Sequence, residues 1–316
     1  MQHILGQSIA LLNALIGATL QSTQYFYGQS LPFTAATLFF VLSLLLFAFK
    51  SSRQKRSKRQ QILFLSCGIL DFSANCFLNL GFKFSNVASV LLLLSLSTPF
   101  AMVFTRILIG QKYDWQRILL AVLSVGFGII YVLLDTETAG AKNIILGDIF
   151  AFVGCILYAL GSVINQMGCE GVDSVCFLAN MAPGAVIVGS VISGVSEYNL
   201  FQTIKWQTWL LILAYAVEMM IFYYITVLLL QKTAAVYFNL CLLVSNVYSF
   251  VIAIFLFKTT PKWYIIFPII GLLACTILYF WYDDKVNKKF LKDNEILQQH
   301  SYQSLNIDVQ EQVNEN

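Results

Sequence analysis

Two carboxylic acids, Asp71 and Glu218, are the only acidic residues that we find well inside the long apolar runs of this chain. If those runs cross a membrane, a charge near the centre costs roughly 2.5–3.5 kcal/mol, so such residues are usually retained for a function. Asn75 and Asn79 follow Asp71 at i+4 and i+8, which places all three on one face of a helix. This polar face either lines a cavity or forms hydrogen bonds to a neighbouring helix.

Glu218 offers a second kind of chemistry. It lies shortly before Tyr223 and Tyr224, and no His, Lys or Arg accompanies it in the same run. A carboxyl group without a cationic partner can bind a proton, which would suit a proton-coupled cycle. The alternative is a protonated side chain that only holds two helices together.

Further polar residues recur at helical spacing in several other runs. Each set is compatible with helix packing, but together they indicate a common polar interior. The candidate solute-binding residues are Asp71, Asn75, Gln24, Ser95, Thr98, Asn165, Glu218, Tyr223, Asn239 and Asn246.

The residue types do not favour catalysis. Most of the seven cysteines lie within apolar runs, where cysteine acts as a small hydrophobic residue. The two histidines, His3 and His300, lie near the chain ends. We therefore expect no catalytic residues, no metal site, no cofactor and no nucleic-acid partner.

The elements that carry these residues are ten apolar runs. The chain is 58% hydrophobic and only 11% charged, and runs of about 20 residues are long enough to cross a bilayer as helices. They lack the alternating pattern of membrane β-strands. The sequence predicts an all-α integral membrane protein with ten transmembrane helices at 6–26, 31–49, 61–82, 86–109, 118–135, 145–167, 175–195, 207–230, 234–257 and 263–282.

The positive charges predict an orientation. With a cytoplasmic N-terminus, the outside gaps hold only Lys83, Lys142, Lys205, Lys258 and Lys262 of the 19 Lys and Arg residues. This positive-inside bias places both termini in the cytoplasm. The compartment stays open between the plasma membrane and an endomembrane. Small residues in 118–135 and 263–282 leave a homodimer seam as an alternative to simple helix packing.

Two stretches of the chain resemble each other. One begins at Lys83 and ends at Trp115, and the other begins at Lys232 and ends at Trp263. They occupy the fourth and ninth runs, and an odd offset of runs inverts one copy in the membrane. We expect two inverted five-helix repeats, residues 1–140 and 141–283, followed by a disordered cytoplasmic tail, 284–316. Chance similarity between apolar helices is the alternative.

Four segments carry a resemblance to a known family: GILDFSANCFL at 68–78, SLSTPF at 95–100, GDIFAFVGCILYALGSVINQ at 147–166 and KTAAVYFNLCLLVSNVYSFVIAIFLF at 232–257. Their order resembles the F branch of solute carrier family 35, within the drug/metabolite transporter superfamily. The resemblance implies ten helices, a central cavity and transport of a small molecule. Typical members read D-x-E-A-N where this chain has Ser73 in place of Glu. Other charged positions are neutral here, including Leu80 and Asn246, whereas Glu218 is an addition.

These observations predict a transporter that moves a small organic solute, nucleoside-like or another metabolite, across the bilayer by alternating access. Few cations lie within the runs, so a nucleotide-sugar exchanger is a less favoured alternative. A receptor or scaffold without transport is another. A membrane enzyme is disfavoured because it would need a nucleophile, a base or a metal cluster, and no His lies within the runs.

Overall fold

The computed structural model describes residues 2–29, 31–53, 57–84, 90, 93–134, 144–201, 203–256 and 263–286. Within these ranges, every predicted apolar run contains a helix. Seven helices are long and apolar enough to cross a membrane, and three apolar helices are shorter: Pro32–Ala48, Leu93–Leu108 and Trp115–Ile130. The prediction of an all-helical fold of membrane type is confirmed.

The helices follow one another with short connections. The first part of the chain forms α1 (Gln2–Tyr27), α2 (Pro32–Leu44), α3 (Lys58–Phe84), α5 (Ser97–Leu108) and α6 (Trp115–Leu134). The second part forms α7 (Ile144–Cys169), α8 (Ser174–Phe201), α9 (Trp206–Leu230), α10 (Ala235–Leu256) and a last helix, Ile266–Val286. A short 3₁₀ turn, Trp263–Ile265, precedes the last helix.

Several boundaries differ from the sequence prediction. α2 ends at Leu44 and continues as two 3₁₀ turns, Leu45–Ala48 and Lys50–Arg53, instead of one helix to residue 49. α8 extends to Phe201, beyond the predicted end at 195. The last helix includes Asp284, which we had assigned to the tail. The boundary predicted between residues 140 and 141 and the tail from residue 287 lie outside the described residues.

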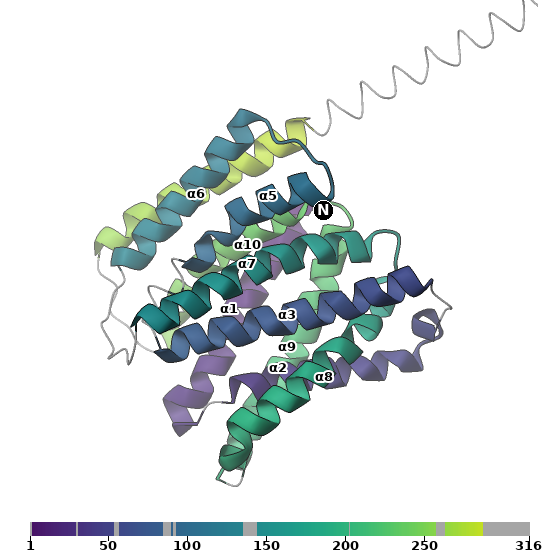
Figure 1. The fold of residues 1–316 in the computed structure, drawn as a ribbon. Helices are drawn as coiled ribbons and strands as arrows, with labels where there is room; N and C mark the ends of the chain where they lie inside the picture. The colour runs from purple at the N-terminus through teal and green to yellow at the C-terminus, as the bar shows by residue number, and fades with distance from the viewer. Residues whose placement is uncertain are drawn as a thin grey trace, which may run out of the picture.

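The helices pack side by side, with α3 against α7 and α8, and α1 against α9 and α10 (Figure 1). α6 and the last helix form a pair at one edge of the bundle. A Cβ atom added at Gly271 would approach the Phe127 ring to 2.4 Å, so glycine allows the close contact within this pair. These are the two helices in which the sequence shows small residues, at 118–135 and 263–282.

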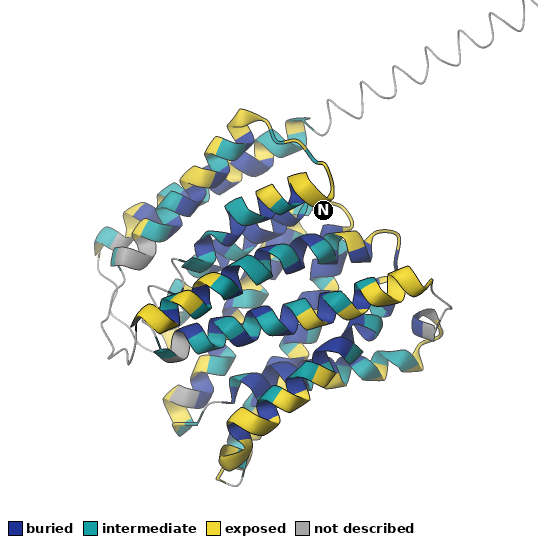
Figure 2. Ribbon diagram, viewed as in Figure 1, coloured by how far each residue is buried: buried dark blue, intermediate teal, exposed yellow. Residues whose placement is uncertain are grey.

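Burial follows the faces of the helices. Side chains that face the bundle interior are buried, whereas outward faces carry exposed apolar residues such as Val195 and Phe255 (Figure 2). The largest apolar core includes Phe39, Phe40 and Tyr223, and the rings of Phe39 and Tyr223 stack at 4.8 Å. Exposed apolar side chains around the outside are typical of helices solvated by lipid.

Hydrogen bonds identify which helix termini meet. At one end, which we call the His3 end, His3 of α1 contacts Tyr237 of α10 and Asp284 of the last helix. At the other, the Gln29 end, the Gln29 side chain contacts Thr203 and Lys205, between α8 and α9, and Thr208 in the first turn of α9. α1 begins at the His3 end and α9 begins at the Gln29 end, so these two helices run in opposite directions.

Candidate functional site

A cavity of about 320 Å³ lies within the bundle. Its walls come from the second halves of α1 and α3, the start of α5 with the residues before it, the middle of α7 and α9, and much of α10. These segments place the cavity between the middle of the bundle and the Gln29 end. Pockets for small organic ligands typically measure about 300–1,000 Å³, so this cavity suits a ligand of modest size.

Amide and hydroxyl groups supply the polar part of the wall. The polar lining residues are Asn13, Asn75, Asn79, Asn239, Asn246, Ser95, Ser97, Thr98, Ser245 and Ser249. Some of these groups fix one another, because the Asn13 amide donates to the Ser245 hydroxyl at 2.8 Å. The Asn239 amide donates to Ser162 at 3.0 Å, and its carbonyl oxygen has no partner among the described residues. Asn239 therefore keeps an unused acceptor beside the cavity.

Aromatic and apolar side chains form the rest of the wall. Tyr158 of α7 and Tyr215, Met219, Phe222 and Tyr223 of α9 contribute to it. Among the described lining residues there is no Lys, Arg, His, Asp or Glu. The wall can therefore hold a flat or apolar ligand body and hydrogen-bond its polar groups without a compensating charge.

The structure distributes the predicted residues over several places. Those in the cavity wall are Asn75, Ser95, Thr98, Tyr223, Asn239 and Asn246. Asp71, Asn165 and Glu218 do not line the cavity and contact other helices instead. Gln24 belongs to α1, but its side chain lies outside the described part of the structure.

Asp71 is buried between three helices. Its two carboxylate oxygens accept hydrogen bonds from the Asn165 amide of α7 at 3.1 and 3.2 Å. The hydroxyl group of Tyr223 on α9 also faces this carboxylate. Asp71 thus lies behind the cavity, and Tyr223 links it to the wall.

Asn75 turns its amide group back to the Asp71 backbone carbonyl, 2.8 Å away. The side-chain oxygen of Asn75 takes no part in that hydrogen bond, and Asn75 lines the cavity. The predicted polar face of this helix therefore divides into two roles, with Asp71 between helices and Asn75 and Asn79 at the cavity.

Glu218 lies at the contact between α9 and α1. Its Oε1 atom accepts a hydrogen bond from Thr19 at 3.1 Å. Its Oε2 atom is buried and has no hydrogen-bond partner among the described residues. Glu218 is therefore less completely satisfied than Asp71.

A further buried acid, Glu197, lies near the end of α8, beyond the predicted end of that run at residue 195. Glu197 is 4% exposed and lies within α8, which extends to Phe201. Its carboxylate accepts the backbone N–H groups of Phe33 and Thr34 at 2.9 and 2.8 Å, and the Thr34 hydroxyl group. Those N–H groups begin α2 and have no partner within their own helix. Glu197 thus caps α2 from a different helix.

Sequence reasoning also missed the aromatic wall on α9. Tyr215, Met219 and Phe222 recur three or four positions apart, which puts them on one helix face. This spacing was available in the sequence, but it is equally typical of helix packing. Only the spatial neighbours of α9 distinguish the two.

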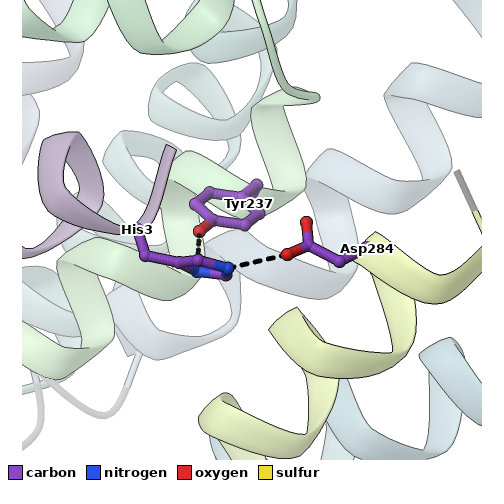
Figure 3. A network of polar contacts seen from close by, with 3 residues as sticks. All are labelled: His3, Tyr237 and Asp284. Carbon is purple, nitrogen blue, oxygen red and sulfur yellow. Dashed lines mark hydrogen bonds and ion pairs between the residues drawn. The ribbon is translucent and has the colours of Figure 1, made fainter. Parts of the chain in front are cut away.

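Polar contacts between helices close the His3 end. The ring nitrogens of His3 contact the Tyr237 hydroxyl at 2.9 Å and the Asp284 carboxylate at 2.7 Å (Figure 3). Arg117 of α6, which is buried, forms an ion pair with Asp283 at 3.1 Å. Burial raises the pKa of nearby Tyr113 to about 12.

Further hydrogen bonds, nearer the bundle centre, join α7, α9 and α10. The side-chain carbonyl oxygen of Gln166 on α7 accepts the Ala235 backbone N–H at the start of α10, at 2.7 Å. The amide of Gln231, which follows α9, donates to the carbonyl oxygens of Cys169 and Val172. These contacts lie on the opposite side of the bundle centre from the cavity. These described residues of α7, α9 and α10 therefore join the helices between the cavity and the His3 end.

Comparisons with known proteins agree with this architecture. A family model described as SLC35F, solute carrier family 35, matches residues 1–281. The mouse protein solute carrier family 35 member F2 is 25% identical over 272 residues, covering 80% of this chain and 71% of the mouse chain. An uncharacterized solute carrier family 35 member from Schizosaccharomyces pombe is 22% identical over 217 residues, covering 67% of this chain and 43% of the yeast chain.

The fold has a close counterpart among solved structures. One crystal structure superposes with a TM-score of 0.70 over 90% of this chain and 98% of the other, at 15% sequence identity. This likeness concerns the fold alone. The family model covers nearly all of the helical bundle, and the predicted resemblance to the family is confirmed by it. The chain belongs to solute carrier family 35, F branch, and is a multi-pass membrane transporter, not an enzyme.

Proposed function

We propose that the chain transports a neutral or weakly charged organic solute of nucleoside-like character, and that the cavity holds it during alternating access. The composition of the cavity wall carries this proposal. Asparagine amides and hydroxyl groups suit the donors and acceptors of a sugar or base, and tyrosine and phenylalanine rings suit its flat face. Because the described wall contains no charged side chain, an uncharged ligand loses the least hydration there.

A nucleotide-sugar exchanger is the second candidate, and the same wall disfavours it. Phosphate groups are usually bound by Arg or Lys side chains or by helix N-termini directed at them. The described wall offers neither cation. Arg106, at the end of α5, is exposed and is not part of the wall.

The packing partners support two inverted repeats. If each helix is exchanged for the one five runs away, the α3–α7 contact becomes the α9–α1 contact. In the same way, α3–α8 becomes α9–α2, α1–α10 becomes α7–α5, and α2–α8 maps onto itself. Inverted repeats around a central site are a recurrent design of secondary transporters, in which one half rocks against the other.

The charge distribution supports a cytoplasmic His3 end. Lys112 and Lys232 lie in connections at that end and Arg117 lies in the first turn of α6, and positive residues are enriched on the cytoplasmic side of membrane proteins. With this topology, the cavity lies toward the non-cytoplasmic side, because it occupies the half of the bundle near the Gln29 end.

Uptake into proteoliposomes tests the proposal. Purified full-length protein is reconstituted, and uptake of labelled nucleosides is compared with uptake of labelled nucleotide sugars. Tyr223→Phe should lower the apparent affinity for the transported nucleoside about 2- to 10-fold, since one hydrogen bond contributes roughly 0.5–1.5 kcal/mol. Tyr224→Phe is the matched control, because Tyr224 is exposed and does not line the cavity.

The outcomes separate the candidates. Uptake of a nucleoside that Tyr223→Phe weakens and Tyr224→Phe does not supports the proposal. Uptake of nucleotide sugars alone favours the exchanger. A scaffold without transport would be favoured if no compound in either set entered and a soluble partner co-purified with the protein.

A further inference from the structure

Asp71 and Glu218 occupy related positions in the two halves of the bundle. Asp71 lies near the middle of α3, the third helical run, and Glu218 lies near the middle of α9, the eighth. Asp71 contacts α7, the first helix of the second half, and Glu218 contacts α1, the first helix of the first half. The exchange that maps α3–α7 onto α9–α1 therefore also maps one carboxylate contact onto the other.

The two contacts lie toward opposite ends of the bundle. Asn165, the partner of Asp71, lies in the part of α7 nearer the His3 end. Thr19, the partner of Glu218, lies in the part of α1 nearer the Gln29 end. The α3–α7 contact thus belongs to the closed side of the cavity, and the α1–α9 contact to the side on which the cavity lies.

The closed contact provides hydrogen-bond donors to both carboxylate oxygens. Asp71 is 5% exposed, and its oxygens face the Asn165 amide and the Tyr223 hydroxyl. The other titratable groups around it are Tyr158 of α7 and Cys67 of α3. Donors from two helices can stabilise a buried carboxylate without a cation.

The opposite contact leaves its carboxylate half satisfied. Glu218 receives one hydrogen bond, from Thr19, and its Oε2 atom is buried without a partner among the described residues. The titratable group that faces it is Tyr215 on the same helix. Among the described residues, no Lys, Arg or His forms an ion pair with Asp71 or Glu218. Tighter packing of α1 on α9 would thus enclose an unsatisfied negative charge.

We propose that Glu218 is a proton-binding site whose neutralisation allows α1 to close on α9 at the Gln29 end. Asp71 is its repeat-related counterpart, which hydrogen bonds keep satisfied when α3 is closed on α7. The proton binds at the Oε2 atom of Glu218 and removes the charge that opposes closure. This inference depends on the alternating access proposed above, and it adds the ion that biases the two conformations.

Hydrogen–deuterium exchange of the full-length protein in lipid nanodiscs tests the inference without a known solute. Exchange is followed at about pH 5.5 and about pH 7.5, within the range in which buried carboxyl groups titrate. Rates are corrected for the intrinsic effect of pH. On acidification, α1 and α9 should gain protection toward the Gln29 end, and α3 and α7 should lose it toward the His3 end. One linked proton changes the equilibrium by up to about tenfold per pH unit.

Three variants sharpen the test. Glu218→Gln should show the acidic pattern at both pH values and lose the pH response. Asp71→Asn should keep the response, because the proposed proton-binding site is Glu218. Glu170→Gln, in the exposed turn after α7, is the matched control and should behave as the wild type.

Wild-type protein alone can overturn the inference, so a variant that fails to fold does not block the test. The inference is wrong if acidification produces no reciprocal change between the two helix pairs. It is also wrong if Glu218→Gln keeps the wild-type pH response. Neither result bears on solute uptake, which the proteoliposome experiment measures separately.

Discussion

Removal of the Glu197 carboxylate should destabilise the start of α2 specifically. Glu197 on α8 accepts two backbone N–H groups of α2, from Phe33 and Thr34, and the Thr34 hydroxyl group. Leu31, the N-cap residue of α2, provides no side-chain hydrogen bond to the start of the helix. In Glu197→Ala these N–H groups would be left without a hydrogen-bond acceptor in a buried position, and α2 would lose its polar connection to α8.

The magnitude follows from two contributions. Loss of a helix cap costs about 0.5–2 kcal/mol, and loss of a negative charge at a partly buried helix N-terminus costs up to about 2 kcal/mol. We therefore expect Glu197→Ala to lower the free energy of unfolding by about 0.5–4 kcal/mol. Glu197→Gln keeps an acceptor oxygen but loses the charge, so its effect should be smaller, about 1–2 kcal/mol.

Thermal unfolding of the purified full-length protein in detergent measures the effect. The order of melting temperatures should be wild type, then Glu197→Gln, then Glu197→Ala, with Glu170→Ala equal to wild type. Hydrogen exchange should accelerate at the first amides of α2 and not in α6. Equal melting temperatures for Glu197→Ala and Glu170→Ala would refute the assignment of Glu197 as the cap of α2.

Three further predictions concern helix contacts. A Cβ atom at Gly68 of α3 would lie 2.0 Å from the Met181 carbonyl oxygen of α8, so Gly68→Ala should cost about 1–3 kcal/mol in a thermal unfolding assay. Gly17→Ala is the control, because a Cβ atom at Gly17 would have no atom within 4 Å. Equal melting temperatures for the two variants would contradict the close contact at Gly68. Breaking the buried Arg117–Asp283 pair by Arg117→Met should cost about 3–5 kcal/mol in the same assay. His3→Ala, which removes a more exposed polar contact with Asp284, should cost at most about 1 kcal/mol. The reverse order would be inconsistent with the burial of Arg117. Ser124→Ala should change the free energy of unfolding by less than about 1 kcal/mol, because the 3.4 Å contact between the Ser124 and Thr276 hydroxyl groups is long for a hydrogen bond. A larger loss of stability in the same assay would contradict this prediction.

The number and type of the helices could be predicted from the sequence because lipid restricts the backbone to a few solutions. Long apolar runs without alternation must be helices, and their polar connections mark the ends. The ends themselves were less predictable. Glu197 resembles a loop residue by polarity, yet α8 continues past it because its charge is satisfied by the N-terminus of another helix. Such a partner is distant in sequence and leaves no local signal.

The candidate site was predictable only in part, for a similar reason. Helical spacing placed Asn75, Asn239 and Asn246 on polar faces, and all three line the cavity. The same spacing could not separate Asp71 from Asn75, because one face of a helix can meet both a cavity and a neighbouring helix. Whether a residue on this face of α3 meets the cavity or a neighbouring helix depends on how α3 packs against α7, and the sequence of α3 alone does not determine that packing.

The claim that the cavity is the path of the solute can be tested most directly by thiol labelling. All seven native cysteines are buried, so a cysteine introduced at the cavity wall can be modified selectively. We compare Asn246→Cys, at the wall, with Val251→Cys, on an exposed apolar face of the same helix. A water-soluble, membrane-impermeant thiol reagent should modify Asn246→Cys and abolish uptake of the solute identified in proteoliposomes, and an excess of that solute should slow the reaction. Uptake that persists after complete modification of Asn246→Cys would contradict the account.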